Sequence, residues 1–384
     1  MDVEFRKFLK RSIYFFIPFA FILLPFALFL LYTGEVVNVK RVITKQIRGT
    51  EDYIFGLAYS EPKEYYKINY LKEFNPDLIA LGSSRVMQIR RAWFFGNYKF
   101  YNAGGTIDYI INLKEFLERL PDKSNLKMIL LGLDPWWFNK KYDDLSQRTS
   151  RAAQYDNFSS KSMFINLRLF LKIFNDYNDG KINFERIIDK KSNFIGISAI
   201  VNKSGYRNDG SYTYGILNDN MNDPVINHDY HFTNTFNRIK TGTQKFETCD
   251  SINFRAVVEL NNFLSECKKK NIYVIGYMAP LANSVYSRLD SLRTKYRYLF
   301  SLEEAITPVF SQHGFSYNSY LNPEKLNLDD SDFIDGFHTN AFSDLHILLK
   351  IAEWDGNFKK FLNENYVRNE LNLCSSANLL QTKK

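Results

Sequence analysis

Short, continuous apolar runs alternate with helix-like patterns in two separate stretches of the chain. The apolar runs cover residues 77–82, 100–103, 127–133, 272–278 and 315–317. Runs of this length, bounded by polar and glycine-rich segments, are typical of parallel strands buried on both faces. The sequence therefore predicts an α/β fold, a flavodoxin-like three-layer α/β/α domain with a central parallel sheet of about five strands.

Helix-like periodicity fills most of the segments between these runs. We expect helices from about residue 85, over 107–120, where Pro121 ends the pattern, over 162–174, 251–269 and 284–312, and finally over 340–354. The residues after Leu371 are predicted to form a loose tail.

The alternating pattern is interrupted once, between residues 134 and 250, where Asn, Asp, Tyr, Phe and Ser dominate. We interpret this segment as an insertion after the third strand, a lid or side lobe. The predicted organisation is a cytoplasmic stub and anchor (1–34), a connector (35–74), an α/β domain (75–135 and 250–355), the insertion (136–249) and a C-terminal extension (356–384).

The N-terminal segment has a different character, since residues 12–32 carry no charge and are mainly Phe, Ile, Leu and Ala. A helix of this length would cross the apolar part of a bilayer, so we predict one transmembrane helix. The alternative is a cleaved signal peptide, but no small-residue cleavage site follows the run. A basic cluster at residues 6–11 precedes it, which predicts an inner-membrane protein with its main domain in the periplasm.

Charge and cysteine content exclude several classes of protein. Of the formal net charge of +8, +5 lies in the first 48 residues, and the small remainder argues against nucleic acid as a partner. Cys249, Cys267 and Cys374 are too few and too widely spaced for a disulfide framework or a zinc site. The segment 228–231 (His-Asp-Tyr-His) offers no further fixed ligand, so we predict no metal and no cofactor.

Residues suited to acyl transfer follow the predicted strands. Ser84 follows the first strand, Gly104 the second and Asp134 the third, and parallel strands bring these ends to one edge of the sheet. Asp335-Gly-Phe-His338 comes after the last strand. A serine nucleophile needs a base and a carboxylate that orients the base. We predict these roles for Ser84, His338 and Asp335; alternatively, Gly-Ser-Ser is an N-capped turn and Asp-x-x-His a surface turn.

This combination resembles the SGNH, or GDSL-like, hydrolase superfamily. That family places its nucleophile in a Gly-Asp-Ser turn, an Asn-x-Gly turn after the second strand and Asp-x-x-His near the C-terminus. The matching residues are Gly82-Ser83-Ser84, Asn102-Ala103-Gly104, and Asp335 with His338. The resemblance covers roughly residues 75–135 and 250–352.

The third family block differs, because Gly132-Leu-Asp134-Pro replaces Gly-x-Asn-Asp. An ionised Asp134 would repel an oxyanion, so we expect the backbone N–H groups of Ser84 and Gly104 to form the oxyanion hole. Asp134 would then face another partner or stay protonated. This variation resembles a membrane-anchored branch of the superfamily related to proteins of teichoic acid alanylation and alginate acetylation.

Several further residues are candidates for substrate binding. Arg85 and Arg207 would each bind an anionic group or, alternatively, only cover the sheet edge. Asp134 is included because of its position in the third block. Five aromatic residues would form a stacking wall for a sugar or acyl group, or alternatively a small core of the insertion: Trp136, Trp137, Tyr206, Tyr212 and Tyr214.

Together these features predict a membrane-anchored serine esterase or O-acyltransferase. Its partners would be an acylated or acyl-accepting glycan of the cell envelope, the inner membrane and a membrane-bound acyl-transfer protein. One alternative is a binding or scaffold protein of an envelope polysaccharide system whose catalytic set has decayed. Another is a soluble cytoplasmic lipase, in which the N-terminal segment has been misread.

Overall fold

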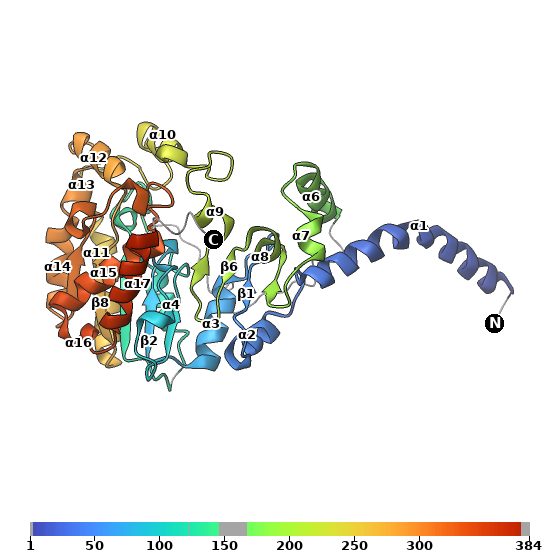
Figure 1. Ribbon diagram of the computed structural model, residues 1–384, viewed down its shortest axis with the longest axis horizontal. Coiled ribbons are helices and arrows are strands. Elements are labelled where there is room, and N and C mark those ends of the chain that lie inside the picture. The colour runs from blue at the N-terminus through green and yellow to red at the C-terminus, as the bar shows by residue number, and fades with distance from the viewer. Residues whose placement is uncertain (1–2, 122, 146–166, 378–384) are drawn as a thin grey trace. The chain divides into compact units, whose positions relative to one another are not determined.

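The computed structural model describes residues 3–121, 123–145 and 167–377, and the chain divides into two compact units (Figure 1). The first unit comprises Met1–Glu61 with Phe158–Gly205, and the second Pro62–Asn157 with Tyr206–Lys384. The predicted connector and the predicted insertion are therefore each shared between the two units.

The second unit is built on a five-stranded sheet with the strand order β3-β2-β4-β8-β9, and every neighbouring pair is parallel. The prediction of an α/β fold with a central parallel sheet of five strands is confirmed. Numbered within the sheet, the order is 2-1-3-4-5, that of flavodoxin-like sheets. The strands are β2 Leu78–Leu81, β3 Phe100–Asn102, β4 Met128–Leu133, β8 Tyr273–Met278 and β9 Ser316–Ser319.

Helices cover both faces of this sheet. A Cβ at Gly276 would lie 2.3 Å from Phe310 of α14 (Leu302–Ser311), so this position of β8 faces that helix. The next residue, Tyr277, points to the opposite face, because side chains alternate along a strand. There it lies within electrostatic range of Asp344 on α15 (Ala341–Trp354). The sheet is thus sandwiched between two helical layers.

The remaining helices of the second unit follow the sequence pattern with some differences. Their bounds are α3 Lys63–Phe74, α4 Asn112–Leu117, α9 Ile216–Asp219, α10 Thr233–Thr241, α11 Phe254–Lys269, α12 Asn283–Ser291, α13 Arg297–Phe300, α16 Gly356–Lys359 and α17 Glu364–Ala377. The helix expected from Arg85 is a single 3₁₀ turn, Ser84–Val86, and the helical stretch 284–312 is divided into α12, α13 and α14. Helix α17 continues through residues 372–377 of the predicted loose tail, and the rest of that tail lies outside the described residues.

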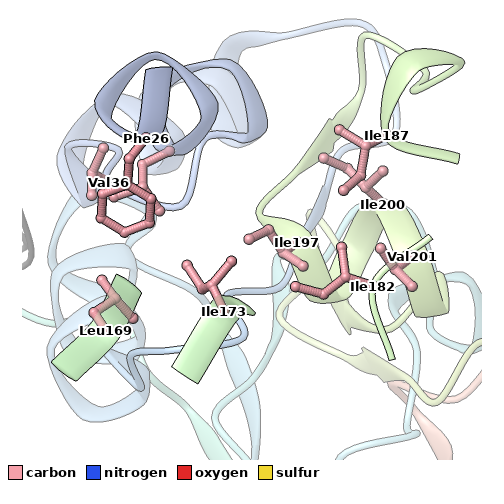
Figure 2. Packing of buried hydrophobic residues seen from close by; sticks show 10 residues of the cluster. Phe26, Val36, Leu169, Ile173, Ile182, Ile187, Ile197, Ile200 and Val201 are labelled. Atoms are coloured by element: carbon pink, nitrogen blue, oxygen red, sulfur yellow. The ribbon is translucent and has the colours of Figure 1, made fainter. Parts of the chain in front are cut away.

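The first unit has its own core. It contains α1 Val3–Thr33, α2 Val39–Arg48, α6 Leu167–Asn178, α7 Phe184–Ile188, α8 Ile197–Asn202 and the parallel pair β1 Ile54–Phe55 and β5 Phe194–Ile195. Figure 2 shows Phe26 and Val36 near Leu169, with Ile173 and Ile197 between these residues and the group of Ile182, Ile187, Ile200 and Val201. The short strand β6, Gly205–Tyr206, contains the boundary between the two units, and the short strand β7, Tyr212–Thr213, belongs to the second unit. Of the predicted helix 162–174, residues 162–166 lie outside the described residues.

A buried carboxylate ties three segments of the first unit together. Glu35 is fully buried, and its oxygens accept hydrogen bonds from the backbone N–H groups of Ala58 and Tyr59 (both 2.8 Å) and of Ile197 (3.0 Å). The one carboxylate therefore joins residues 35, 58–59 and 197.

The predicted membrane span lies within α1. In the part of the chain that the structure describes, no helix is both long enough and apolar enough to cross a membrane, and the predicted transmembrane helix is not found.

Candidate active site

Ser84, His338 and Asp335 form one hydrogen-bonded series in the second unit. The Ser84 hydroxyl lies 2.7 Å from His338 Nε2, and His338 Nδ1 lies 2.7 Å from Asp335 Oδ2. The side chains of His338 and Asp335 are 16% and 23% exposed, so the site is partly open to solvent. A hydroxyl, an imidazole and a carboxylate in this order can transfer a proton away from the serine.

Ser84 is exposed by a tight turn at the carboxyl end of β2. Ser83 caps this turn, since its Oγ accepts a hydrogen bond from Arg85 N at 3.2 Å. The turn packs against glycines, because a Cβ at Gly132 would lie only 2.2 Å from Val86 Cγ1. A larger residue at Gly132 would displace Val86, two positions after the nucleophile.

The loop that carries His338 is fixed mainly by Asp335. Its Oδ1 accepts hydrogen bonds from the backbone N–H groups of Phe337 (3.0 Å) and His338 (2.8 Å), while Oδ2 faces the imidazole. Burial tends to raise the pKa of Asp335, but the imidazole and the two N–H donors outweigh it and hold the pKa below 3.8. Asp335 is therefore a carboxylate at neutral pH and fixes the orientation of the ring.

The two predicted oxyanion donors differ in availability. Gly104 N already donates to Asn102 Oδ1 at 2.8 Å, and the Asn102 amide in turn donates to the carbonyl oxygens of Val86 and Ile89. The Gly104 N–H, which the sequence predicts as an oxyanion donor, therefore already has an acceptor in this structure. Ser84 N has no acceptor in the described part of the chain, as expected for the first residue of a helical turn.

Arg85 and Asp134 form a buried ion pair below the site. Their side chains are 1% and 2% exposed, and Arg85 Nη1 lies 3.5 Å from Asp134 Oδ1. Burial raises the pKa of Asp134, and the Arg85 guanidinium opposes this rise. Asp134 thus faces an internal partner, one of the two alternatives that the sequence left open.

The Arg85 guanidinium also connects the loops around the site. Its Nε donates to the carbonyl oxygen of Phe337 (2.8 Å), and its Nη2 donates to those of Ala279 (2.8 Å) and Pro280 (2.6 Å). Because Arg85 is buried and follows Ser84 directly, it joins the nucleophile turn to the loop before His338. The prediction that Arg85 binds a substrate anion is wrong, since no face of it is open to a ligand.

The predicted aromatic wall is only partly at the surface. Trp136 and Trp137 are buried, so Trp136 cannot stack on a substrate as predicted. Tyr206, which is also buried, forms a row of adjacent rings with the half-buried Tyr212 and Tyr214, with centroids 5.1 Å apart in each step, and Tyr214 lies 6.4 Å from the His338 ring. This row leads directly to the proposed base.

Arg207 lies in the turn before β7 and is half-buried. Its backbone N donates to the Ser211 carbonyl oxygen (2.8 Å), and its Nη1 lies 3.4 Å from Ser211 Oγ. The described contacts do not bring Arg207 to the triad.

Lys245 is a site residue that sequence reasoning missed. Its ammonium lies 4.8 Å from the Trp136 ring and 4.7 Å from the Phe337 ring, so it covers the residue next to His338. Burial lowers its pKa, and Asp134 opposes that effect. No motif surrounds Lys245 in the irregular segment of the sequence, which therefore gave no signal for it.

The structure gives no metal site to the residues that it describes, in which no group of three or more His, Cys, Asp or Glu is arranged to hold an ion. Asp229 of the segment 228–231 accepts hydrogen bonds from Thr235 and from Gly336 N. Cys249 and Cys267 are free buried thiols.

Comparison with protein-family models gives no match for this chain, and no curated protein is significantly similar to it in sequence.

Proposed function

We propose that this protein is a serine esterase or O-acyltransferase of the SGNH type. The observation that carries this proposal is the continuous hydrogen-bonded series from Ser84 Oγ through the imidazole of His338 to Asp335. The order of the sequence blocks and the five-stranded parallel sheet support the same assignment. The reaction needs only protein groups that are present.

In the proposed reaction, Ser84 Oγ attacks the carbonyl carbon of an ester or thioester while its proton moves to His338 Nε2. The carbonyl electron pair shifts to oxygen, and the Ser84 N–H stabilises the resulting charge. When the tetrahedral intermediate collapses, the bond to the leaving oxygen or sulfur breaks and His338 protonates that atom. Water or a sugar hydroxyl then attacks the acyl-enzyme by the same route, and Asp335 stabilises the imidazolium in both steps.

The proposed location is the outer side of the inner membrane, and the proposed substrate an acylated or acyl-accepting envelope glycan. Support for this location comes from the uncharged segment 12–32, the basic cluster before it and the exposure of large apolar side chains along α1, among them Phe15, Phe16, Phe21 and Leu24. A membrane-bound acyl-transfer protein would act as the partner.

A C-terminal alkaline phosphatase fusion tests this location, because the phosphatase is active only outside the cytoplasm. We expect active phosphatase from the full chain. Inactive phosphatase, in cells where the fusion is intact by immunoblot, would instead favour a cytoplasmic protein.

A second candidate is a binding or scaffold protein on the same fold. It is favoured by Asp134 in place of the family asparagine and by the engaged Gly104 N–H, which together leave fewer oxyanion donors. Loss of one donor typically lowers the rate by a factor of about 100 to 1,000.

Steady-state hydrolysis of p-nitrophenyl acetate separates the two candidates. We expect activity in the wild type, its loss in Ser84→Ala and His338→Ala, and full activity in Ser291→Ala, a control at an exposed serine of α12. Wild-type hydrolysis no faster than that of Ser84→Ala would favour the scaffold.

A further inference from the structure

The second unit contains a cavity of about 810 Å³ that the proposed chemistry does not use. Its walls come from residues 218–223, 227, 229–232, 284, 330, 331, 333 and 334, mostly within the irregular segment of the sequence. This volume lies in the range of about 300–1,000 Å³ that is usual for ligand sites.

The cavity wall is connected to the loop of the triad. Ile334 lines the cavity, and the next residue is Asp335. Two further lining residues hold this loop, since Asn227 Nδ2 donates to the Ile334 carbonyl oxygen at 3.2 Å and Asp229 Oδ2 accepts a hydrogen bond from Gly336 N at 3.0 Å. A molecule in the cavity would therefore lie beside the segment that positions His338.

The lining consists mainly of hydrogen-bonding side chains with a negative charge. It includes four asparagines (218, 220, 222 and 227) and four aspartates (219, 223, 229 and 330), and no Lys or Arg is among the described lining residues. The buried Asn218 Oδ1 has no hydrogen-bond partner within the described chain. Amides and carboxylates suit hydroxyl groups and amines, whereas phosphates and uronates would be repelled.

An aromatic pair forms part of the same wall. The rings of Tyr230 and His231 stack with centroids 3.9 Å apart. His231 and Phe232 both have positive φ, +53° and +57°, a backbone conformation that such residues rarely adopt. Strained conformations of this kind are often found where a loop holds a ligand.

From these features we propose that the cavity binds the glycan part of the substrate, as a neutral or amine-bearing oligosaccharide. This inference rests on the proposed function for the term substrate, but the binding itself does not require catalysis. Hydroxyls would bond to the side chains of Asn218, Asp219 and Asn222, and one apolar sugar face would lie on the Tyr230 ring.

Isothermal titration calorimetry on the full chain tests the proposal with three tetrasaccharides: tetra-N-acetylchitotetraose, its deacetylated form and tetragalacturonate. Tetra-N-acetylchitotetraose and its deacetylated form should each bind Ser84→Ala as tightly as wild type. Tetragalacturonate should bind neither protein. Tyr230→Ala should weaken binding about tenfold. Asp219→Asn should weaken only the amine-bearing probe, about fivefold. Glu304→Gln, which changes an exposed residue of α14, is the control and should bind each probe like wild type.

The proposal is overturned if no neutral or amine-bearing probe binds, if tetragalacturonate binds as tightly, or if Tyr230→Ala and Asp219→Asn, each folded by circular dichroism, bind like wild type. Binding without hydrolysis of p-nitrophenyl acetate would remove the proposed esterase and leave the glycan site. Hydrolysis of p-nitrophenyl acetate without binding of any tetrasaccharide would remove the glycan site and leave the proposed esterase.

Discussion

At the scale of single residues, Asp335 contributes most to the order of the site, because its two oxygens hold both the backbone and the ring of His338. In Asp335→Asn an amide replaces the carboxylate beside His338 Nδ1. Its N–H group can donate to Nδ1, which favours the imidazole tautomer that carries its proton on Nε2 and cannot accept the proton of Ser84. We expect kcat for p-nitrophenyl acetate to fall about 10⁴-fold with KM nearly unchanged. A loss of less than tenfold would show that Asp335 does not orient the base.

Arg85 and Asp134 are expected to act as a coupled pair. Arg85→Met leaves a buried carboxylate without its cation, which should lower the free energy of unfolding by about 3–5 kcal/mol. Arg85→Met/Asp134→Leu should recover part of this stability, because both charges are gone. Its kcat should stay low, since the bonds from Arg85 to the Phe337 and Ala279 carbonyl oxygens are still missing.

Urea denaturation and steady-state kinetics of wild type, Arg85→Met, Asp134→Leu and the double variant measure the changes in stability and in kcat. Additive stability changes in the two single variants would show that the pair is not coupled.

Asp344 should make stability depend on pH. It is buried on α15, accepts a hydrogen bond from Thr339 Oγ1 at 2.9 Å, and burial raises its pKa to about 7 from 3.8. The folded state binds this proton more tightly than the unfolded state. The contribution of the protonated group is therefore complete below pH 3.8 and is lost as the pH rises through 7.

Urea denaturation between pH 4 and 8 should show this loss in the wild type and a smaller pH dependence in Asp344→Asn, which keeps the neutral shape. Parallel pH curves for the two proteins would mean that Asp344 is not the titrating group.

At the scale of elements, Gly132 of β4 allows the nucleophile turn to pack. In Gly132→Ala, the new Cβ meets Val86 at a distance that real atoms do not reach. We expect a loss of about 1–3 kcal/mol in stability together with a lower kcat, and recovery of both when Val86→Ala is added.

Gly356→Ala is the matched control, because its Cβ would have no atom within 4 Å. If Val86→Ala brings no recovery, contact between β4 and the turn is not what positions Ser84.

The elements also show how far the sequence can predict this structure. The buried strands were recognisable because β2 and β4 are apolar on both faces. Asp335-x-x-His338 was recognisable because residues i and i+3 can approach each other within one turn. Gly104 was predicted less well, since the Asn102 side chain competes for its N–H and this competition depends on local geometry.

At the scale of the whole molecule, the division into two units was not predictable. The core of the first unit joins Phe26 and Leu30 to Leu169 and Ile173, which are far apart in the sequence. Its strands β1 and β5 have two residues each, too few for a recognisable period. The predicted boundaries at residues 34 and 136 followed changes in composition, whereas the units follow contacts.

A destabilising substitution in the first unit should lower hydrogen-exchange protection in that unit and leave the protection of the second unit unchanged. Glu35→Ala removes the acceptor of three backbone N–H groups, of which that of Ile197 is buried and costs about 1–3 kcal/mol when left unpaired. Hydrogen exchange of the full chain should become faster at residues 54–59 and 194–202, with unchanged protection in β4 and β8. Equal loss of protection in β4 would show that the two units unfold as one cooperative unit. Glu51→Ala, at an exposed position, is the control and should leave the exchange rates unchanged.

The central claim, that Ser84 is an activated nucleophile, is tested most directly by labelling the full chain with a fluorophosphonate and mapping the adduct by peptide mass spectrometry. We predict one adduct on Ser84 in the wild type and in Ser83→Ala, and none in Ser84→Ala. Equal labelling of Ser84→Ala, or no labelling of the folded wild type, would contradict it.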